Sequence, residues 1–429
     1  MKRILILGGN FFPEPTGIGK YNGEMADWLV KNKFDVTVVT TFPYYPQWKV
    51  QSPYVKRSYW FKTEKKVIDD AIKPVKIIRC PHYVPAKPSG LKRMISDFSI
   101  LFSTFLVILR LLFCTKYDYV LTVAPPFQTG LLAIFYKVIR KATILYHIQD
   151  LQIDAAKDLG MIKSQFLIKV LFNIEKFILK HSDYVSSISD GMIRRIELKC
   201  NKPILFLPNW VETEKFFPIK NKAQLKTEFG FLETDKVVLY SGAIGEKQGI
   251  ESILHVAATL KEMRNVKFVI CGSGPYKEKL LVMRKKMMLD NIVFLPLQPH
   301  EKFNEFLNMA DIHLVLQKGG ASDLVMPSKL STILAVGGLS IITATEGTGL
   351  YEYVLKNQIG ILIEPENQKA LEYHIKLALD ENQSEIRSNA RLYAQNNLSI
   401  ESNLSKYFFE VGASYNMLDT YTNANAIKI

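Results

Sequence analysis

A long glycine-containing loop stands where a strand gives way to a helix near the start of the chain. Residues 8–21 read GGNFFPEPTGIGKY and follow the apolar run Ile4–Leu7. The segment FFPEPT separates Gly17 and Gly19 from the first glycine pair by too many residues for the compact GxGxxG turn that binds a dinucleotide. The next expected strand ends in Val-Thr-Thr and lacks the acidic residue that would bind a ribose. Both observations argue against a dinucleotide-binding loop. A Walker loop is excluded because Tyr21 follows Gly-Lys. The loop instead predicts an anion site at a helix N-terminus, where N–H groups and the helix dipole favour phosphate.

Three further turns that could bind a ligand follow expected strands in the second half of the chain. SGAIGEKQG contains Gly242 and Lys247, ICGSGP contains Gly272, and MPSKLSTILAVGG opens a helix at Ser328 and Lys329. A lysine at the start of a helix opposes the helix dipole unless an anion neutralises it. Two lysines beside free helix N–H groups predict a clamp for a diphosphate. Taken singly, either lysine is equally compatible with a solvated surface role.

The segment HIQD contains the candidate catalytic residues, His147 and Asp150, at the end of an expected strand. An α/β sheet presents its working side chains at the carboxyl ends of its strands. A histidine in an apolar strand is also compatible with a buried core role, and the sequence leaves both interpretations open.

The cysteines and acidic residues give no sign of a bound metal. Cys80, Cys114, Cys200 and Cys271 stand far apart, with no CxxC pair and no histidine at ligand spacing. This spacing argues against a zinc site and against a disulfide framework, and it suits a reducing compartment. No DxD motif follows a strand, so we expect no cofactor and no required divalent ion.

Short apolar runs alternate with amphipathic stretches, which is the pattern of βαβ units around parallel sheets. Two series of such runs predict two doubly wound domains, with a break near Pro208 and Pro218. We expect a first domain over 1–208, a second over 209–400, and a C-terminal helix and tail over 401–429 that packs back on the first domain. The expected strands are RILIL, DVTVVT, VKIIR, DYVLTVA, TILYHI and YVSSIS, then KVVLYSG, VKFVICG, NIVFLP, DIHLVL, LSIIT and GILIE. A cleft between the domains, facing the carboxyl ends of both sheets, is the expected binding site.

The net charge of +14 is concentrated in the first half. Residues 1–208 contain 31 Lys and Arg against 16 Asp and Glu, whereas the remainder contains 24 against 25. Such an excess implies an anionic surface or substrate. The interleaved aromatics and cations of PYYPQWKVQSPYVKRSYWFK suit a membrane surface or a lipid-linked substrate, and no nucleic-acid-binding signature accompanies them.

The segment LKRMISDFSILFSTFLVILRLLFCTK, residues 91–116, is apolar with basic residues at both ends. It predicts either a core helix of the first domain or an interfacial helix whose cations meet lipid phosphates. No stretch of about 20 uncharged apolar residues predicts a clear transmembrane helix. The N-terminal run is too short for a signal peptide and is expected to be a strand.

Several of these motifs, taken in order, carry a resemblance to a known family. GIGKY, PYYPQW, RCPHYVPAKPS, YHIQDLQIDAAKDLG, FLPNW, LYSGAIGEKQG and MPSKLSTILAVGG span most of residues 1–400. Together they resemble the colanic-acid biosynthesis glycosyltransferases, members of the group 1 (family 4) retaining glycosyltransferases of GT-B fold, in which two Rossmann-like domains face each other across a cleft. The resemblance implies a nucleotide-sugar donor, an acceptor on a polyprenyl diphosphate carrier, and work at the cytoplasmic face of the inner membrane.

The resemblance also assigns roles to the donor-side residues. It places Gly17 and Gly19 against the donor phosphates, Lys247 on the diphosphate and Lys329 as a further basic residue beside the donor. We expect Gly242, Gly272 and Ser328 to line the same site.

The resemblance makes His147 the histidine near the transferred sugar, with Asp150 as the neighbour that orients it. On this assignment His147 positions hydroxyls or stabilises the sugar, and no enzyme nucleophile is needed. Retention is then explained by same-face attack assisted by the departing phosphate.

Two departures from the family pattern stand out. Ala243 occupies a position where many members have an arginine, and Leu324 and Thr332 occupy the positions of a pair of glutamates. Asp323 and Ser328 are the nearest polar substitutes. Which groups bind the ribose and orient the sugar is therefore left open by the sequence.

The expected activity is transfer of fucose from GDP-fucose to a lipid-linked sugar, with the lysines meeting the charge of the leaving nucleoside diphosphate. The alternative is transfer of N-acetylfucosamine or another hexosamine from a UDP donor in O-antigen or capsule synthesis. A non-catalytic membrane scaffold and an NAD-linked epimerase are disfavoured, the first by the retained histidine and lysines and the second by the missing dinucleotide fingerprint. We expect a cytoplasmic protein, peripheral on the inner face of the plasma membrane.

Overall fold

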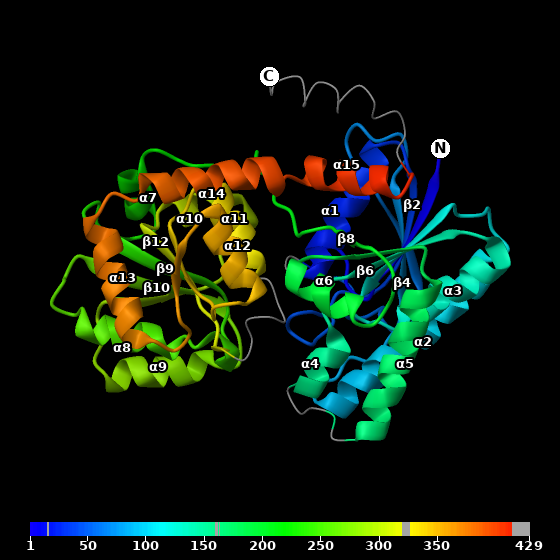
Figure 1. The fold of residues 1–429 in the computed structure, drawn as a ribbon, viewed down its shortest axis with the longest axis horizontal. Coiled ribbons are helices and arrows are strands. Elements are labelled where there is room, and N and C mark those ends of the chain that lie inside the picture. Colours follow the sequence, from blue (N-terminus) through cyan, green and yellow to red (C-terminus); the bar gives the residue numbers. More distant parts are fainter. Residues whose placement is uncertain (15–16, 159–161, 163, 320–326, 414–429) are drawn as a thin grey trace. The chain divides into compact units, whose positions relative to one another are not determined.

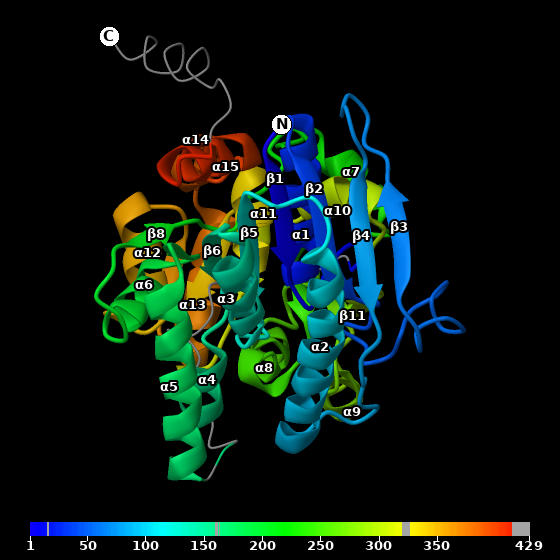
Figure 2. The ribbon, with the colours of Figure 1, turned by 90° about the vertical axis from the view of Figure 1, so that its right-hand side faces the viewer.

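The computed structural model describes residues 1–14, 17–158, 162, 164–319 and 327–413. It divides the chain into two compact units, one formed by Met1–Pro208 with Leu404–Ile429 and the other by Asn209–Asn403. The break between Pro208 and Asn209 falls where the alternation of strands and helices is interrupted in the sequence. Figures 1 and 2 show both units as α/β structures.

The first unit is built on an eight-stranded sheet in the order β3-β4-β2-β1-β5-β6-β7-β8. Every pairing is parallel except that of β3 with β4. The strands are β1 Arg3–Leu7, β2 Asp35–Thr41, β3 Lys62–Lys66, β4 Val75–Cys80, β5 Tyr119–Ala124, β6 Thr143–Ile148, β7 Tyr184–Ser187 and β8 Ile204–Phe206. The helices are α1 Ile18–Lys31, α2 Gly90–Leu111, α3 Thr129–Arg140, α4 Gln152–Asp158, α5 Gln165–His181 and α6 Asp190–Glu197.

The second unit is built on an all-parallel sheet in the order β11-β10-β9-β12-β13-β14. The strands are β9 Lys236–Ala243, β10 Val266–Ser273, β11 Ile292–Leu295, β12 Ile312–Val315, β13 Ser340–Thr343 and β14 Ile361–Ile363. The helices are α7 Lys222–Glu228, α8 Glu251–Thr259, α9 Lys277–Lys286, α10 Phe303–Asn308, α11 Ser328–Ala335, α12 Gly349–Asn357, α13 Gln368–Asp380 and α14 Ser384–Asn397, with short 3₁₀ turns η1 Glu246–Gln248 and η2 His300–Lys302.

Helices cover both faces of the second sheet, as Figure 1 shows. Alternate residues of β9 divide between two cores: Val237 and Leu239 pack with α10, α11 and α12, whereas Val238 and Tyr240 pack with α8, α9 and α13. Because successive strand side chains point to opposite faces, a strand buried on both sides is apolar throughout. The continuous apolar runs of the sequence therefore correctly predicted a doubly covered parallel sheet.

The C-terminal helix α15, Ile400–Glu410, contributes to the first unit. Phe408 is buried, its ring stacks on Trp28 of α1 at 5.7 Å, and it also meets the ring of Phe34 at 5.8 Å. The Lys2 side chain and the Tyr119 hydroxyl both donate to the carbonyl of Gly412 just beyond the helix. The last helix thus completes the core of the domain in which the chain begins.

Helix α2 is apolar over most of its circumference. Residues Lys92–Leu111 have a mean hydropathy of 1.8 and are long and apolar enough, by length and composition alone, to cross a membrane, a test that a core helix also passes. One side of α2 packs against β2, β4 and α3. On the other side an apolar stripe is exposed: Ile95, Phe98, Phe102 and Leu106. The helix is therefore both a core element and an exposed apolar surface.

We expect Phe408→Ala to lower the free energy of unfolding by about 3 kcal/mol, because it leaves a cavity between α15 and α1. Phe409, on the same helix, is 58 % exposed. The matched change Phe409→Ala should therefore cost no more than about 0.5 kcal/mol. Urea denaturation of both variants measures the difference, and equal losses would show that α15 does not pack as described.

Candidate active site

The carboxyl ends of β9 and β10 form a bare backbone edge in the second unit. Gly242 and Gly272 are register partners, and a Cβ on Gly272 would lie 1.9 Å from the carbonyl oxygen of Gly242. Two residues further on, a Cβ on Gly274 would lie 2.1 Å from the carbonyl oxygen of Ile244. Side chains are thus excluded by direct collision. The glycines at this edge therefore have a packing reason of their own, and their predicted contact with a donor stays a prediction.

Lys329, in the first turn of α11, reaches back over this edge. Its Nζ lies 3.7 Å from the centroid of the Tyr240 ring, and a Cβ on Gly242 would lie 3.6 Å from the same Nζ. The Nζ atom is buried and has no hydrogen-bond partner in the part of the chain that the structure describes. Burial lowers the pKa of the Lys329 ammonium from its ordinary value to about 7. The ring supplies only a cation–π contact, which does not replace the lost hydration.

The start of α11 is electropositive for a second reason. Ser328 is exposed, the preceding Pro327 provides no side-chain cap, and the first turn contains no acidic residue. The first N–H groups of this helix therefore have no side-chain acceptor at the cap position. Thr332, at the position of a family glutamate, donates its hydroxyl to the Lys329 carbonyl. Asp323 and Leu324 lie outside the described residues.

Lys247 is exposed on the short turn η1 that follows β9. Its carbonyl accepts a hydrogen bond of 2.8 Å from the N–H of Lys318, whose ammonium pairs with Glu251 at 2.9 Å. This bond ties the loop after β9 to the loop after β12, and these two strands are neighbours in the sheet. The structure thus places Lys247 and Lys329 on the same edge of the second unit, and their joint contact with a diphosphate stays a prediction.

The glycine loop of the first unit is organised by a carboxylate that the sequence analysis did not single out. Glu14 is buried, its Oε1 accepts from the N–H groups of Tyr44 and Tyr45 at 2.9 Å each, and its Oε2 accepts from Asn10 at 2.9 Å. Burial is the main cause that raises the pKa of the Glu14 carboxyl. The only signal in the sequence was an acidic residue inside a loop expected to bind an anion.

The two glycines of this loop differ in what they require. Gly17 caps α1 at φ 61° and ψ −145°, a conformation that suits glycine, and a Cβ there would meet nothing within 4 Å. Gly19 is confined by its neighbour, because a Cβ there would lie 2.7 Å from the Cβ of Glu14 and 2.8 Å from its Oε2. Gly19 therefore permits the carboxylate to approach the helix, and the predicted contact of both glycines with a donor remains untested.

His147 lies inside the first sheet. It is 1 % exposed, and its Nδ1 forms a 3.0 Å hydrogen bond with the Ser186 hydroxyl on β7, which in turn contacts the Tyr407 hydroxyl of α15. Burial lowers the pKa of the His147 imidazole to about 3, so the ring is neutral. The structure shows a buried histidine, as the second interpretation expects, and the predicted role of His147 near the transferred sugar stays a prediction. Ser186 rather than Asp150 orients Nδ1.

The polar groups at the carboxyl edge of this sheet come from helix α2 and from the residues that follow β5 and β6. Asp150 follows β6 and interacts electrostatically with Tyr45, while the Nε2 atom of the preceding Gln149 is buried without a partner among the described residues. Asp97 on α2 accepts a 2.7 Å hydrogen bond from Gln152 and another from Gln128. Burial raises the pKa of the Asp97 carboxyl to about 6.

Sequence reasoning missed Asp97 because it stands within an apolar helix, far along the chain from its partners. Carboxylates and amides gathered at one sheet edge are suited to binding the hydroxyls of a sugar. A carboxyl whose pKa is near neutrality is also suited to accept a proton.

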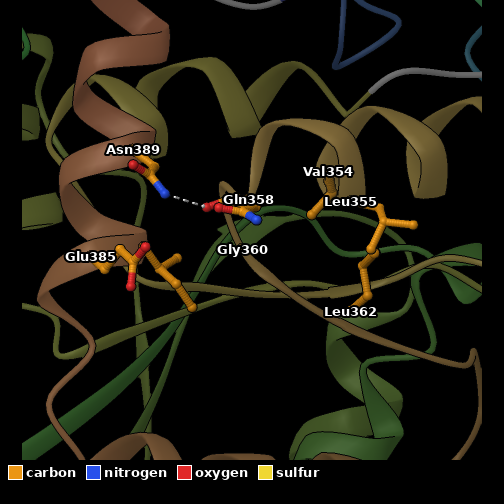
Figure 3. Close-up of a pocket in the computed structure, with 8 residues that line it drawn as sticks. Val354, Leu355, Gln358, Gly360, Leu362, Glu385 and Asn389 are labelled. Atoms are coloured by element: carbon orange, nitrogen blue, oxygen red, sulfur yellow. Dashed lines mark hydrogen bonds between the residues drawn. The ribbon is translucent and has the colours of Figure 1, made fainter.

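A pocket of about 380 Å³ in the second unit is shown in Figure 3. It lies among α12, β14 and α14, where Asn389 donates to the carbonyl of Gln358 at 3.4 Å. Gly360 and Leu362 place it at the start of β14, the amino end of a parallel strand. Ligands of open α/β sheets bind at the opposite, carboxyl edge. We therefore assign the candidate site to the Gly242–Lys329 edge. Within the described ranges, no group of three His, Cys, Asp or Glu side chains is placed to bind a metal.

Two doubly wound α/β domains are the architecture of the GT-B glycosyltransferases, and glycines and a buried lysine lie at the sheet edge of one of them. The chain belongs to the family described as glycosyl transferases group 1, which matches residues 221–397. It is 36 % identical over 419 residues to WcaI of Escherichia coli (strain K12), a glycosyl transferase assigned to colanic acid biosynthesis, and the match covers 95 % of this chain and 99 % of WcaI.

Solved structures agree with the fold. Sucrose-phosphate synthase of Thermosynechococcus elongatus is similar with a TM-score of 0.72 and 15 % identity, covering 97 % of this chain and 100 % of that one. HepE of Anabaena, solved with UDP-glucose, is similar with a TM-score of 0.67 and 13 % identity, covering 96 % and 100 %. At these identities the likeness establishes the fold alone. The prediction of the family and of its two Rossmann-like domains is thus confirmed.

We expect Gly19→Ala to destabilise the protein by about 1–3 kcal/mol, because the new methyl group must displace the Glu14 side chain. In the double variant Gly19→Ala/Glu14→Gly, which removes both the Cβ and the carboxylate of residue 14, the methyl group has room, so its added cost should largely disappear. Urea denaturation of the two single variants and the double variant measures this coupling. Strictly additive losses would contradict the proposed reason for the glycine.

Proposed function

We propose that the protein is a retaining glycosyltransferase that moves fucose from GDP-fucose onto a sugar carried by a polyprenyl diphosphate, in the synthesis of a colanic-acid-like exopolysaccharide. The likeness to WcaI over nearly the whole chain supports the pathway. The observation that carries the chemistry is the buried Lys329 ammonium, which has no partner among the described residues at the glycine edge of the second sheet.

The leaving group explains why such a lysine is useful. When the bond between sugar and nucleoside diphosphate breaks, negative charge grows on the phosphate and an oxocarbenium-like centre forms on the sugar. An ammonium that is desolvated beforehand binds this developing charge without having to shed water, and the N–H groups at the start of α11 add to the effect. Lys247 supplies a second, mobile cation from the exposed turn η1. With cations in this role we propose that no metal or other cofactor is needed.

The first unit supplies the acceptor side in this proposal. Gln128 and Gln152 hold the Asp97 carboxyl, whose pKa of about 6 suits it to accept a hydrogen bond, and then a proton, from the attacking sugar hydroxyl. The Gln149 amide is a further donor for a hydroxyl at this edge. The sequence analysis assigned this proton-accepting role to no residue, and the role that it predicted for His147, to position hydroxyls or stabilise the sugar, stays a prediction.

The second candidate is transfer of N-acetylfucosamine or another hexosamine from a UDP donor in O-antigen or capsule synthesis. HepE, which shares the fold, has been solved with UDP and with UDP-glucose. Recognition of a purine or a uracil base depends on loop contacts around LPLQPH, residues 295–300. The resemblance to the family does not identify which base these residues select. The donor base is therefore an experimental question.

We further propose that the protein works at the inner face of the plasma membrane as a peripheral protein. The exposed stripe of α2 provides an apolar surface, and Lys92, Arg93 and Arg110 flank it. An apolar helix face with cations at its ends suits the boundary between lipid tails and anionic headgroups.

We expect one nucleoside diphosphate in a panel of GDP, UDP, dTDP and ADP to raise the melting temperature selectively, and GDP to be that ligand. Lys329→Met should abolish most of this shift. It should also raise the melting temperature of the free protein near pH 7, since the cost of burying an ammonium is removed. Lys356→Met, an exposed change on α12, should leave both quantities unchanged.

The affinity for the nucleotide sugar should depend on pH through the charge of Lys329. The pKa of the free Lys329 is about 7, and a bound diphosphate must raise it. Affinity for the nucleotide sugar is therefore full below pH 7 and declines as the pH rises above it, with a proton taken up on binding. Calorimetry in buffers of different ionisation enthalpy measures that proton. Selective binding of UDP would favour the second candidate, and no turnover of any nucleotide sugar would remove the enzymatic proposal.

We expect Phe98→Ser/Phe102→Ser to reduce binding to vesicles that contain anionic lipid by about tenfold or more, because burying each ring contributes about 1.5–3 kcal/mol. Tyr373→Ser/Leu392→Ser alters two exposed side chains of the second unit and serves as the control. Co-sedimentation at low and high salt measures binding, which should weaken as salt screens the cations. Equal binding by all three proteins would exclude α2 as the docking surface.

A further inference from the structure

The segment between β2 and β3, residues 42–61, is anchored to the first sheet by one buried aromatic side chain. The Tyr54 hydroxyl donates to Glu64 at 3.0 Å, its ring packs on Phe42 at 5.7 Å, and the Arg79 guanidinium lies 4.8 Å from the ring centroid. At its beginning, the same segment is held by the bonds from Tyr44 and Tyr45 to Glu14. In Figure 2 it is the blue loop beside β3. The segment is therefore a fixed platform at the edge of the sheet.

A basic pocket lies directly after this anchor. It has a volume of about 530 Å³ and is lined by Ser52, Pro53, Val55, Lys56, Arg57 and Lys62. Lys62 is partly neutralised, because its Nζ lies 3.0 Å from Glu64 and also over the Tyr54 ring. Lys56 and Arg57 are exposed and form no ion pair with any described residue. The pocket thus gathers three cations with a single carboxylate.

Two exposed aromatic side chains lie between the pocket residues Arg57 and Lys62 in the sequence. Tyr59 is 78 % exposed and Trp60 is 68 % exposed, and the Trp60 ring meets the Phe61 ring edge-on at 5.6 Å. Large exposed aromatic side chains are unfavourable in water but suit the headgroup depth of a bilayer. A cationic hollow beside such residues is matched to a phosphate that is held at a membrane surface.

We propose that this basic pocket, defined by Lys56, Arg57 and Lys62, binds the diphosphate group of the membrane-embedded lipid carrier that bears the acceptor sugar. A diphosphate presents several oxygens and more than one negative charge to a site with two uncompensated cations, whereas a phospholipid headgroup presents one phosphate charge. Arg57 can make two parallel hydrogen bonds to a phosphate, and Lys56 adds a point charge. The inference rests on the proposed lipid-linked acceptor and adds to it a binding site outside the sugar-transfer centre.

The test uses the full chain and three probes: phosphatidylcholine vesicles with a few per cent polyprenyl diphosphate, phosphatidylcholine vesicles with phosphatidylglycerol at equal charge, and soluble inorganic diphosphate. We expect the protein to prefer the first vesicles, and Lys56→Gln/Arg57→Gln to weaken that binding by about tenfold or more, as loss of charge-assisted contacts implies. Binding to phosphatidylglycerol vesicles should fall much less. Excess inorganic diphosphate should compete with the vesicles for the wild-type protein.

The matched control is Lys285→Gln/Lys286→Gln, which removes two adjacent exposed cations from α9 in the second unit. This control should bind both kinds of vesicle like the wild type. Lys56→Arg/Arg57→Lys preserves the charges and should retain preference for the diphosphate vesicles, and a thermal melt shows that the Gln variant is folded. Equal losses on both vesicles, an unchanged Gln variant, or equal losses in the control would each overturn the proposal. Vesicle binding needs no sugar donor, so a failure of glycosyl transfer would be seen separately.

Discussion

In the second domain, the ammonium of Lys329 is buried without a hydrogen-bond partner among the described residues, and such burial is costly. The side chain of Lys329 lies over the Tyr240 ring and beside Gly242, where the lack of a side chain at the end of β9 leaves room for it. The free protein keeps this cation poorly solvated and lowers its pKa to about 7. In the proposed function, a bound diphosphate would supply an opposite charge and hydrogen-bond acceptors to this ammonium.

The first domain uses buried charge differently. Glu14 and Arg79 are almost fully buried, but both are satisfied by backbone groups: Glu14 takes the N–H groups of Tyr44 and Tyr45, and Arg79 donates to the carbonyls of Phe12 and Thr41. Paired in this way, the charges hold three loops in one arrangement and are not available to a ligand. The polar groups that we propose for acceptor binding lie elsewhere in this domain, around Asp97 and at Lys56 and Arg57.

Most of the fold was predictable because its strands are buried on both faces. Such strands appear as uninterrupted apolar runs, and all six strands of the second sheet were predicted from these runs. In the first sheet, β3 and β8 were missed. Strand β3 has the sequence KTEKK and lies at the edge, where its charged side chains remain partly in water, so pairing with β4 rather than its own composition makes it a strand.

The sequence by itself determined the family and the two Rossmann-like domains, since these depend on local periodicity and on motifs a few residues long, and it also predicted which glycines and lysines follow the strands of the second sheet. Only the tertiary structure decided which polar groups are hydrogen-bonded within the protein and which have no partner among the described residues. It showed that His147 forms a hydrogen bond with Ser186 inside the sheet and that the Glu14 carboxylate accepts a hydrogen bond from the N–H of Tyr44. It also showed that Asp97 forms hydrogen bonds with Gln128 and Gln152. Burial and hydrogen-bond partners arise from contacts between residues far apart in the chain, and no local pattern encodes them.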